Sequence, residues 1–321
     1  MSDTRVTGEG LSLLLACHPK LSRIEHKETF HSFKLIQEKY DPEDKYYLKH
    51  LSTIDENISP YEFDYVIDHC PYLETIKITS AGLLNENLYR LMTLKHLTSL
   101  HLGNKNCQSF NFYEGVAPVL EEIGMNLKKL VLEDFTEVDV DFIGAKCLNL
   151  TKLALSGILT YAPIGQLNPK YFRKLQSLEL WNNIGQDHEL TVCQNTLKQL
   201  LFRSPLDYVL LQRIGNLTDD LFKEILQMNR LLTLRNVVID YCHNITGRLF
   251  WMLLEQPNKL NLLRSWHNKG VQEDTKDSIR NVIKDENLNI YWEYYPYNEY
   301  EELLDAGLIN FDDDDDDEED S

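Results

Sequence analysis

The sequence predicts an α/β solenoid, in which short strands stack into one parallel sheet and a helix follows each strand. The spacing L-x-x-L-x-L, or a close relative of it, recurs along the chain. The first positions of six successive copies lie 24, 30, 23, 25 and 22 residues apart. A chain of 321 residues, 43% of them hydrophobic, can also bury an extended core. A near-constant period of this length indicates repeated units that each hold one strand and one helix.

The leucine copies define the expected strands. In an extended strand, successive side chains point to opposite faces, so Leu100 and Leu102 point inward while His101 points outward. A single unit cannot bury its apolar face, whereas stacked units can. The clear copies are Leu73-Ile76-Ile78, Leu97-Leu100-Leu102, Leu127-Leu130-Leu132, Leu150-Leu153-Leu155, Leu175-Leu178-Leu180 and Leu197-Leu200-Phe202, preceded by the partial copies Leu21-Ile24 and Leu48-Leu51.

Two copies extend the match to nine residues. Leu175-Leu178-Leu180-Asn183 ends in Asn, and Leu234-Val237-Ile239-Cys242 ends in Cys. At this position a small side chain bonds the backbone where the strand turns outward, strongly for Asn and weakly for Cys. The period and the motif are those of leucine-rich repeats. We therefore expect a horseshoe-shaped solenoid, with about nine to eleven parallel strands on the concave side and helices on the convex side.

Helix boundaries can be placed between the strands. Thr7, Thr218 and Thr246 precede apolar stretches, where a threonine hydroxyl can accept a hydrogen bond from a free backbone N–H. Cys70-Pro71 ends another helix, because proline cannot continue it. Asp277 to Ile283 is expected to be the last helix and Leu288-Asn289-Ile290 the last strand.

The cysteine-containing repeats suggest a family. Cys242 is followed by His243-Asn244-Ile245-Thr246, and Cys70-Pro71-Tyr72-Leu73 leads from a helix into a strand. Over roughly residues 5 to 290 the chain resembles the cysteine-containing leucine-rich-repeat region of F-box/LRR-repeat proteins. The resemblance implies a substrate-recognition or adaptor component of an SCF-type ubiquitin ligase, acting in ubiquitin-dependent protein catabolism. No F-box is visible here, so Skp and cullin partners are implied only if a longer product supplies one.

The two ends of the expected array differ. The helix that carries Leu11, Leu13, Leu14 and Leu15 opens the chain and needs a cover, so we expect either a truncated or alternative product or a partner at that end. We expect the repeat array over residues 1–290, an aromatic and acidic C-terminal cap segment over 291–310 and a disordered acidic tail over 311–321. The aromatic segment either caps the last repeat or forms a peptide-binding patch.

A partner is expected on the concave face. The outward-pointing strand positions form this surface, and most of them are polar. Large apolar or arginine side chains cluster in a few of them, and Trp and Arg are enriched at interface hot spots. The competing interpretation is that isolated exposed apolar residues are ordinary. The candidate partner-binding residues are Trp181, Arg203, Leu201, Glu179, Val131 and His101.

Composition narrows the function further. The formal net charge is −19, of which nine charges lie in the run Asp312 to Asp320. A surface this acidic repels phosphate backbones, so we expect no nucleic-acid partner. No signal peptide or membrane span is visible, and the six cysteines form no C-x-x-C pair, so we expect an intracellular protein of the cytoplasm or nucleus, without a membrane partner.

The sequence also contains no pattern of catalytic residues. We find no phosphate-binding loop, no metal-ligand spacing of histidines and no nucleophile motif. We therefore expect a protein that is not an enzyme and that needs no metal or cofactor. The alternative function is an acidic-tailed, chaperone-like binder of basic nuclear proteins such as histones.

Overall fold

The computed structural model describes residues 6–40, 45–53, 57–104, 109–181 and 192–298. The chain forms two compact units. The first comprises Met1–Leu178 with Asn195–Pro205, and the second Glu179–Gln194 with Leu206–Ser321. The expected α/β leucine-rich-repeat architecture is confirmed, because the main sheet has, among the described residues, 11 strands that follow one another in sequence order.

The strands of the first unit begin the sheet. Their order is β1-β2-β3-β4-β5-β7, and each pairs with its neighbour in parallel. Ile24, Leu51, Ile76, Leu100, Leu130 and Leu153 occupy one register position and are all buried. The bounds are β1 (Arg23–Glu25), β2 (His50–Ser52), β3 (Thr75–Ser80), β4 (Ser99–Asn104), β5 (Lys129–Glu133) and β7 (Lys152–Ser156). β9 (Ser177–Trp181) begins in the first unit and ends in the second.

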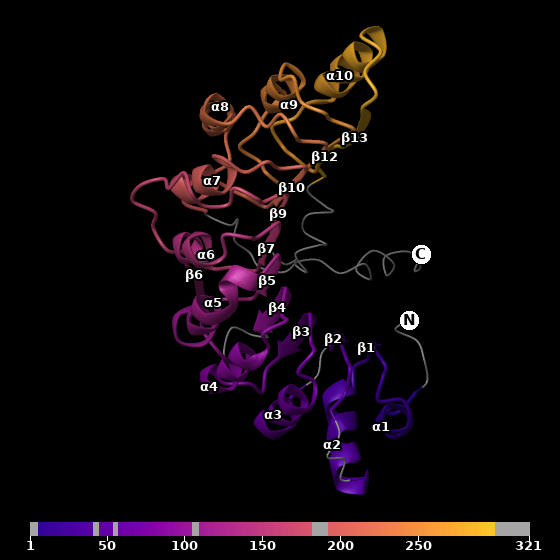
Figure 1. Ribbon diagram of the computed structural model, residues 1–321. Coiled ribbons are helices and arrows are strands. Elements are labelled where there is room, and N and C mark those ends of the chain that lie inside the picture. Colours follow the sequence, from indigo (N-terminus) through magenta and orange to yellow (C-terminus); the bar gives the residue numbers. More distant parts are fainter. Residues whose placement is uncertain (1–5, 41–44, 54–56, 105–108, 182–191, 299–321) are drawn as a thin grey trace, which may run out of the picture. The chain divides into compact units, whose positions relative to one another are not determined.

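The helices of the first unit all lie on one side of its strands (Figure 1). The α-helices are α1 (Gly8–Cys17), α2 (Thr29–Tyr40), α3 (Pro60–His69), α4 (Asn85–Leu88), α5 (Ala117–Ile123), α6 (Val140–Lys146) and α7 (Gln194–Leu201). Shorter helical turns are η1 (Tyr89–Thr93), η3 (Phe112–Val116) and η4 (Gly124–Asn126), and β6 (Glu137–Val138) pairs with β8 (Thr160–Tyr161) in a small separate sheet.

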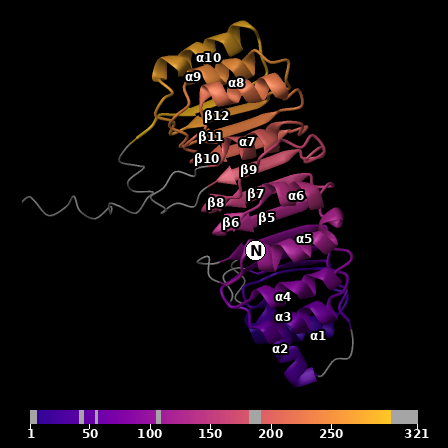
Figure 2. The same ribbon diagram turned by 90° about the vertical axis from the view of Figure 1, so that its left-hand side faces the viewer.

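The second unit repeats the same layering. Its strands β10 (Tyr208–Gln212), β11 (Asn236–Asp240), β12 (Leu262–Trp266) and β13 (Tyr291–Tyr295) pair in parallel. The helices α8 (Asp219–Met228), α9 (Gly247–Leu254) and α10 (Glu273–Asp285) cover one side of these strands (Figure 2). In both units the core therefore lies between the strands and the helices.

The expected helix N-caps are confirmed. The side chains of Thr7, Thr218 and Thr246 accept hydrogen bonds from backbone N–H groups in the first turns of α1, α8 and α9. α3 has an additional cap that we did not expect, in which Ser59 and Glu62 form a reciprocal capping box. Each cap satisfies a backbone donor that the helix itself leaves free.

One expected strand is a helix. Leu197, Leu200 and Phe202 were predicted to be strand residues, but Gln194–Leu201 form α7. The strand of this repeat is β10, in which Val209 and Leu211 are buried, and Leu206 just before the strand is buried as well. The error has a physical cause. Leu197 and Leu200 fit the strand spacing together with Phe202, but together with Leu201 they also have the i, i+3, i+4 spacing that lines one face of a helix.

The last strand also lies later than expected. It is β13 (Tyr291–Tyr295), and Leu288-Asn289-Ile290 precede it. The indole Nε1 of Trp292 donates to the carbonyl of Lys276 at 3.2 Å, and the hydroxyl of Tyr294 donates to the carbonyl of Val271 at 3.1 Å. The first residues of the expected cap segment are thus a repeat strand. Residues 299–310 of that segment and the tail 311–321 lie outside the described residues.

The first helix has the half-exposed apolar surface that the sequence suggested. Leu11 and Leu15 are buried, whereas the exposed fractions of Leu13 and Leu14 are 53% and 42%. Cys70, Cys147 and Cys242 are buried as packing residues, whereas Cys17 is exposed. Cys17 is the last residue of α1, the first helix among the described residues.

Candidate functional site

The surface of interest is the open face, which we define as the side chains of the main sheet that point away from the helices. Four of the predicted partner-binding residues lie on it. His101 on β4 and Val131 on β5 are partners in register and both are half-buried. Glu179 and Trp181 lie two residues apart on β9, and both are half-buried. His101 and Val131 belong to the first unit, and Glu179 and Trp181 to the second.

The other two predicted residues are not on the open face. Leu201 is the last residue of α7 and only 1% of it is exposed, so it belongs to the core. Arg203 follows that helix in a bend, is exposed, and lies over the ring of Phe202 at 5.3 Å. Both were assigned to the face because the α7 leucines were taken for a strand. The predicted pairing of Trp181 with Arg203 and Leu201 is therefore withdrawn.

His101 has an ionic neighbour that the sequence did not predict. Its Nε2 lies 2.9 Å from Oε2 of Glu133 on β5. Burial acts to raise the pKa of Glu133, but the contact with His101 and the charges of His101 and Lys77 outweigh it, so the pKa lies below its ordinary value. The open face of the first unit thus holds an ionised carboxylate next to histidine and lysine.

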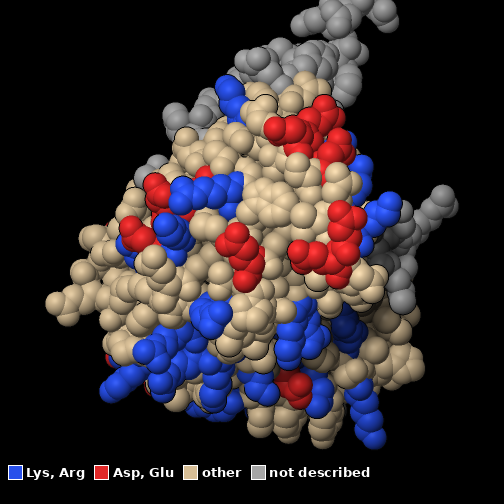
Figure 3. Space-filling view, turned by 90° about the horizontal axis from the view of Figure 1, so that it is seen from above, with Lys and Arg blue, Asp and Glu red and all other residues tan. Residues whose placement is uncertain are grey.

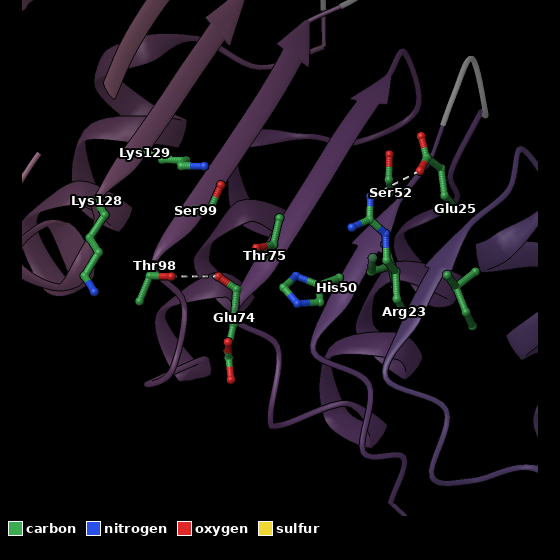
Figure 4. A pocket seen from close by; sticks show the side chains of 12 residues that line it. Arg23, Glu25, His50, Ser52, Glu74, Thr75, Thr98, Ser99, Lys128 and Lys129 are labelled. Atoms are coloured by element: carbon green, nitrogen blue, oxygen red, sulfur yellow. Dashed lines mark hydrogen bonds and ion pairs between the residues drawn. The ribbon is translucent and has the colours of Figure 1, made fainter. Parts of the chain in front are cut away.

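A groove crosses the first unit at the starts of its strands. It has a volume of about 380 Å³ and spans β1 to β5. Figure 4 shows Arg23 and Glu25 at one end, Lys128 and Lys129 at the other, and hydroxyl side chains between them. We call this hollow the strand-start groove; it is lined by Arg23, Ile24, Glu25, His50, Leu51, Ser52, Glu74, Thr75, Thr98, Ser99, Lys128 and Lys129.

The charges of the strand-start groove are unevenly compensated. A nitrogen of Arg23 lies 3.6 Å from a carboxylate oxygen of Glu25. Lys49, beside the groove, is paired with Glu74 at 2.7 Å. Among the residues that the structure describes, Lys128 and Lys129 have no acidic partner, and both are exposed. The uncompensated positive charge therefore lies at the β5 end.

The open face of the second unit is different in chemistry, because it is rich in aromatic side chains. Tyr208, Leu262 and Tyr291 occupy one register position, and Trp266 and Tyr295 are partners in another. Tyr291 and Tyr295 are 61% and 51% exposed. We call this surface the aromatic face and define it as Tyr208, Leu262, Arg264, Trp266, Tyr291 and Tyr295.

Arg264 is fixed at the centre of the aromatic face. Its Nε lies 2.6 Å from Oε2 of Glu293, and its guanidinium lies 5.0 Å from the centre of the Trp266 ring. Trp266 meets Tyr295 edge to face, with ring centroids 5.9 Å apart. An arginine held by a carboxylate and an indole loses little further freedom when a partner binds.

Tyr208 is half-buried on the aromatic face. Burial raises the pKa of its phenol, and the nearby carboxylate of Glu179 raises it further, while Arg264 acts in the opposite direction. Its hydroxyl therefore stays protonated at neutral pH and can donate a hydrogen bond to a partner.

The strand ends of the second unit carry a stacked ladder of side chains. The guanidinium of Arg213 lies 4.4 Å from the centre of the Tyr241 ring, which stacks on His267 at 4.6 Å. These residues have φ values of 56°, 48° and 52°, in the left-handed region, so the backbone turns sharply after β10, β11 and β12. Nδ1 of His267 lies 3.0 Å from Asp240, which also accepts from Gln212 at 2.7 Å. The ladder stiffens one edge of the aromatic face.

Acidic side chains gather at the starts of two helices of the second unit. Asp219, Asp220, Glu273 and Asp274 lie in the first turns of α8 and α10. Acidic side chains at helix starts are stabilised by the helix dipole. Figure 3 shows Lys and Arg side chains gathered along the lower edge of the view, with most Asp and Glu side chains above them. The net charge of −19 therefore does not indicate where the basic and acidic side chains gather on this surface.

Sequence reasoning missed the aromatic face for two reasons. The strand of this repeat was assigned to the leucines of α7 and not to β10, so Tyr208 was not assigned to a strand. Residues 291–295 were assigned to a cap segment, so Tyr291 and Tyr295 were not placed beside Trp266. A signal was available: the aromatic stretch Tyr291-Trp292-Glu293-Tyr294-Tyr295 is composed mostly of residues favoured in strands.

Comparison with solved structures shows the same fold. The protein in "Crystal structure of Rad7 and Elc1 complex in yeast" is similar over 94% of this chain and 79% of that chain, with 15% identity and a TM-score of 0.53. A second structure, "Crystal structure of TLR13-ssRNA13 complex", is similar over 89% of this chain and 38% of that chain, with 15% identity and a TM-score of 0.48. At such identities the likeness is one of fold alone. The likeness to the first of these structures supports the leucine-rich-repeat fold independently of the sequence motif.

The chain lacks a match among protein families and curated proteins, and its described residues form neither a metal site nor a membrane-spanning helix. No protein-family model matches the sequence, and no curated protein matches it. Within the described ranges, no group of three or more His, Cys, Asp or Glu side chains could hold a metal ion. None of the helices described here is both long enough and apolar enough to cross a membrane.

Proposed function

We propose that this chain is a protein-recognition module and not an enzyme, and that it binds its partner through the open face of the sheet. The observation that carries the proposal is the aromatic face, where Tyr208, Trp266, Tyr291 and Tyr295 surround Arg264. Trp, Tyr and Arg dominate the energetics of protein interfaces because each buries a large area and also offers a directional polar contact. A surface of this composition fits a protein partner.

The size of the aromatic face is consistent with an interface centre. Four parallel strands lie about 4.8 Å apart, so the face is about 14 Å wide. A typical partner buries about 800 Å² on each side. The face is therefore large enough for a hot-spot cluster, and a partner would also contact the surrounding polar surface.

Within this role, we propose a substrate-recognition or adaptor component related to SCF-type ubiquitin ligases. The cysteine-containing repeat motif supports it, with Cys70, Cys147 and Cys242 buried. A protein of similar fold has been solved in complex with Elc1, which supports partner binding by this architecture. Skp and cullin subunits would join only if a longer product supplies an F-box.

The test is affinity purification of the full chain from cells, with quantitative mass spectrometry. We expect a substrate protein, together with Skp and cullin subunits where the purified product carries an F-box. The variant Trp266→Ala with Tyr295→Ala should lose the substrate by about tenfold or more, since each aromatic truncation at a hot spot costs about 2 kcal/mol. Tyr113→Ala is the matched control, because Tyr113 is an exposed tyrosine on the helical side. Arg203→Glu should also have no effect, whereas Trp181→Ala should weaken capture.

Two outcomes would contradict the proposal. Unchanged capture by the Trp266→Ala, Tyr295→Ala variant would show that the aromatic face is not the binding surface. Recovery of histones without Skp or cullin subunits would favour the second candidate, an acidic chaperone-like binder, which the run Asp312 to Asp320 supports by its charge. In that case capture should disappear when these acidic residues are changed to Asn and Gln.

A further inference from the structure

The strand-start groove of the first unit is chemically unlike the aromatic face. Its middle is lined by the hydroxyl groups of Ser52, Thr75, Thr98 and Ser99, and its β5 end by Lys128 and Lys129. The chain has a net charge of −19, so a concentration of unpaired lysines on it is unexpected. The groove takes no part in the aromatic interface proposed above.

Three other lysines of the first unit are paired with carboxylates, whereas the two that line the groove are not. Lys49 is paired with Glu74 at 2.7 Å, Lys95 with Glu122 at 2.8 Å and Lys146 with Glu121 at 2.7 Å. In the part of the chain that the structure describes, Lys128 and Lys129 have no such partner. Their ammonium groups are therefore free to bind an external anion.

The backbone holds these two lysines in place. The N–H groups of Lys128 and Lys129 both donate to the carbonyl of Thr98, at 2.8 and 3.1 Å. The carbonyl of Lys128 accepts from the hydroxyl of Thr151 at 2.9 Å. Because the main chain is already ordered, an anionic ligand would need to order only the two side chains.

The dimensions of the groove fit an extended peptide. It crosses the strands β1 to β5, and four strand spacings of about 4.8 Å give a length of about 19 Å. An extended chain advances about 3.3 Å per residue, so roughly six residues would span it. The hydroxyl groups along β2 to β4 can donate to or accept from the peptide's main chain.

The charge pattern of the groove is directional. Glu25 lies at the β1 end and Glu74 near the middle, while the unpaired lysines lie at the β5 end (Figure 4). An anionic side chain is therefore attracted at the β5 end, whereas the paired charges of Arg23 and Glu25 give it no net attraction at the β1 end. A nucleic acid, which is charged along its whole length, would meet both carboxylates and the net negative charge of the chain.

We propose that the strand-start groove binds an extended protein segment that carries a cluster of Asp or Glu side chains at one end. The cluster lies against Lys128 and Lys129, and the uncharged remainder lies along the hydroxyl groups toward Glu25. The inference rests on the proposed function, because it specifies the chemistry of part of the recognised partner. It uses residues other than those of the aromatic face.

Fluorescence anisotropy on the full chain tests the proposal, with a labelled six-residue peptide that has three acidic residues followed by Ser-Gly-Ser. Lys128→Glu with Lys129→Glu should weaken binding by about tenfold or more, because two charge-assisted contacts become repulsive. Lys128→Arg with Lys129→Arg should retain binding, which separates charge from folding. Lys170→Glu with Lys223→Glu is the matched control: it changes the net charge equally at exposed positions outside the groove.

Three results would overturn the proposal. Equal peptide affinity of the wild type and the Lys128→Glu, Lys129→Glu variant would remove the groove as the site. Tighter binding of a single-stranded oligonucleotide through the same lysines would assign the groove to nucleic acid. Tighter peptide binding after Asp312 to Asp320 are changed to Asn and Gln would assign it to the chain's own acidic run. The proposed function is tested separately by substrate capture. If the Trp266→Ala, Tyr295→Ala variant loses capture, the proposed function holds even when one of these three results overturns the groove proposal.

Discussion

At the scale of single residues, a buried polar side chain links two neighbouring repeats. Asn268 is buried: its amide nitrogen donates to the carbonyl of Ile239 at 2.8 Å, and its oxygen accepts from the N–H of Cys242 at 2.7 Å. These bonds link neighbouring repeats where the strands turn outward. Cys242 itself contributes mainly packing, as the weak contacts of its sulfur indicate. Burial also raises the pKa of Cys147 to about 12, so this thiol stays protonated and unreactive.

The pair of His101 and Glu133 makes stability depend on pH. The pKa of Glu133 is lower in the folded chain than in the unfolded chain, so the carboxylate stabilises the fold above the unfolded pKa of about 4.3. This contribution is lost as the pH falls through the folded pKa. We expect Glu133→Gln to be less stable than the wild type at pH 7 and to lose less stability on acidification from about pH 5 to about pH 3.

Urea unfolding of both proteins at a series of pH values measures this effect. The informative quantity is the difference between the two free energies of unfolding, which should shrink as the solution becomes more acidic. A difference that stays constant across the series would mean that Glu133 titrates alike in the folded and unfolded chains.

At the scale of elements, one leucine-rich segment has a spacing that fits either a helix or a strand. The leucines Leu197, Leu200 and Leu201 lie on the buried side of α7, and the strand that they were expected to form is β10. Within β10, Val209 and Leu211 point into the core, while Leu210 points to the open face and is half-buried. The alternation of buried and half-buried side chains in β10 therefore identifies it as the strand of this repeat.

Substitution within β10 tests this assignment. Leu211→Ala should lower the free energy of unfolding by about 2–5 kcal/mol, because it leaves a cavity between the sheet and α8 or α9. Leu210→Ala, one residue away and of the same chemistry, should cost about 1 kcal/mol or less. Chemical denaturation measures both. Equal losses, or a larger loss for Leu210→Ala, would mean that the strand has the opposite face in the core.

At the scale of the whole molecule, two units carry two different open faces. The first unit offers the strand-start groove, with hydroxyl groups and unpaired lysines, and the second unit offers the aromatic face. Contacts between exposed charges are screened by salt, whereas burial of aromatic surface is not. The two faces should therefore respond differently to ionic strength.

We expect peptide binding in the groove to weaken steeply between about 0.05 M and about 0.5 M salt, while substrate capture that depends on Trp266 and Tyr295 changes little. Anisotropy titrations and capture assays over the same salt series measure the two effects. The wild type serves as its own control, because both faces are present in one chain. Parallel salt dependences would show that the two activities share one surface.

Much of the fold follows directly from the sequence. The repeat period, the caps at Thr7, Thr218 and Thr246, and the strands of the first unit were all predicted, because a regular spacing of leucines reports which face of each element is buried. His101, Val131, Glu179 and Trp181 were also placed on the open face by strand alternation alone. Local periodicity was sufficient for these features.

Only the tertiary structure decided the rest. The choice between helix and strand at Leu197 to Leu201, and the place of Tyr291 to Tyr295 in the sheet, depend on which neighbours cover each segment. The groove at the strand starts and the aromatic face around Arg264 join residues from repeats that are far apart in sequence. Spacing along a chain records which side of an element is buried, but a binding surface is made by side chains from different elements. The register between strands brings those side chains together.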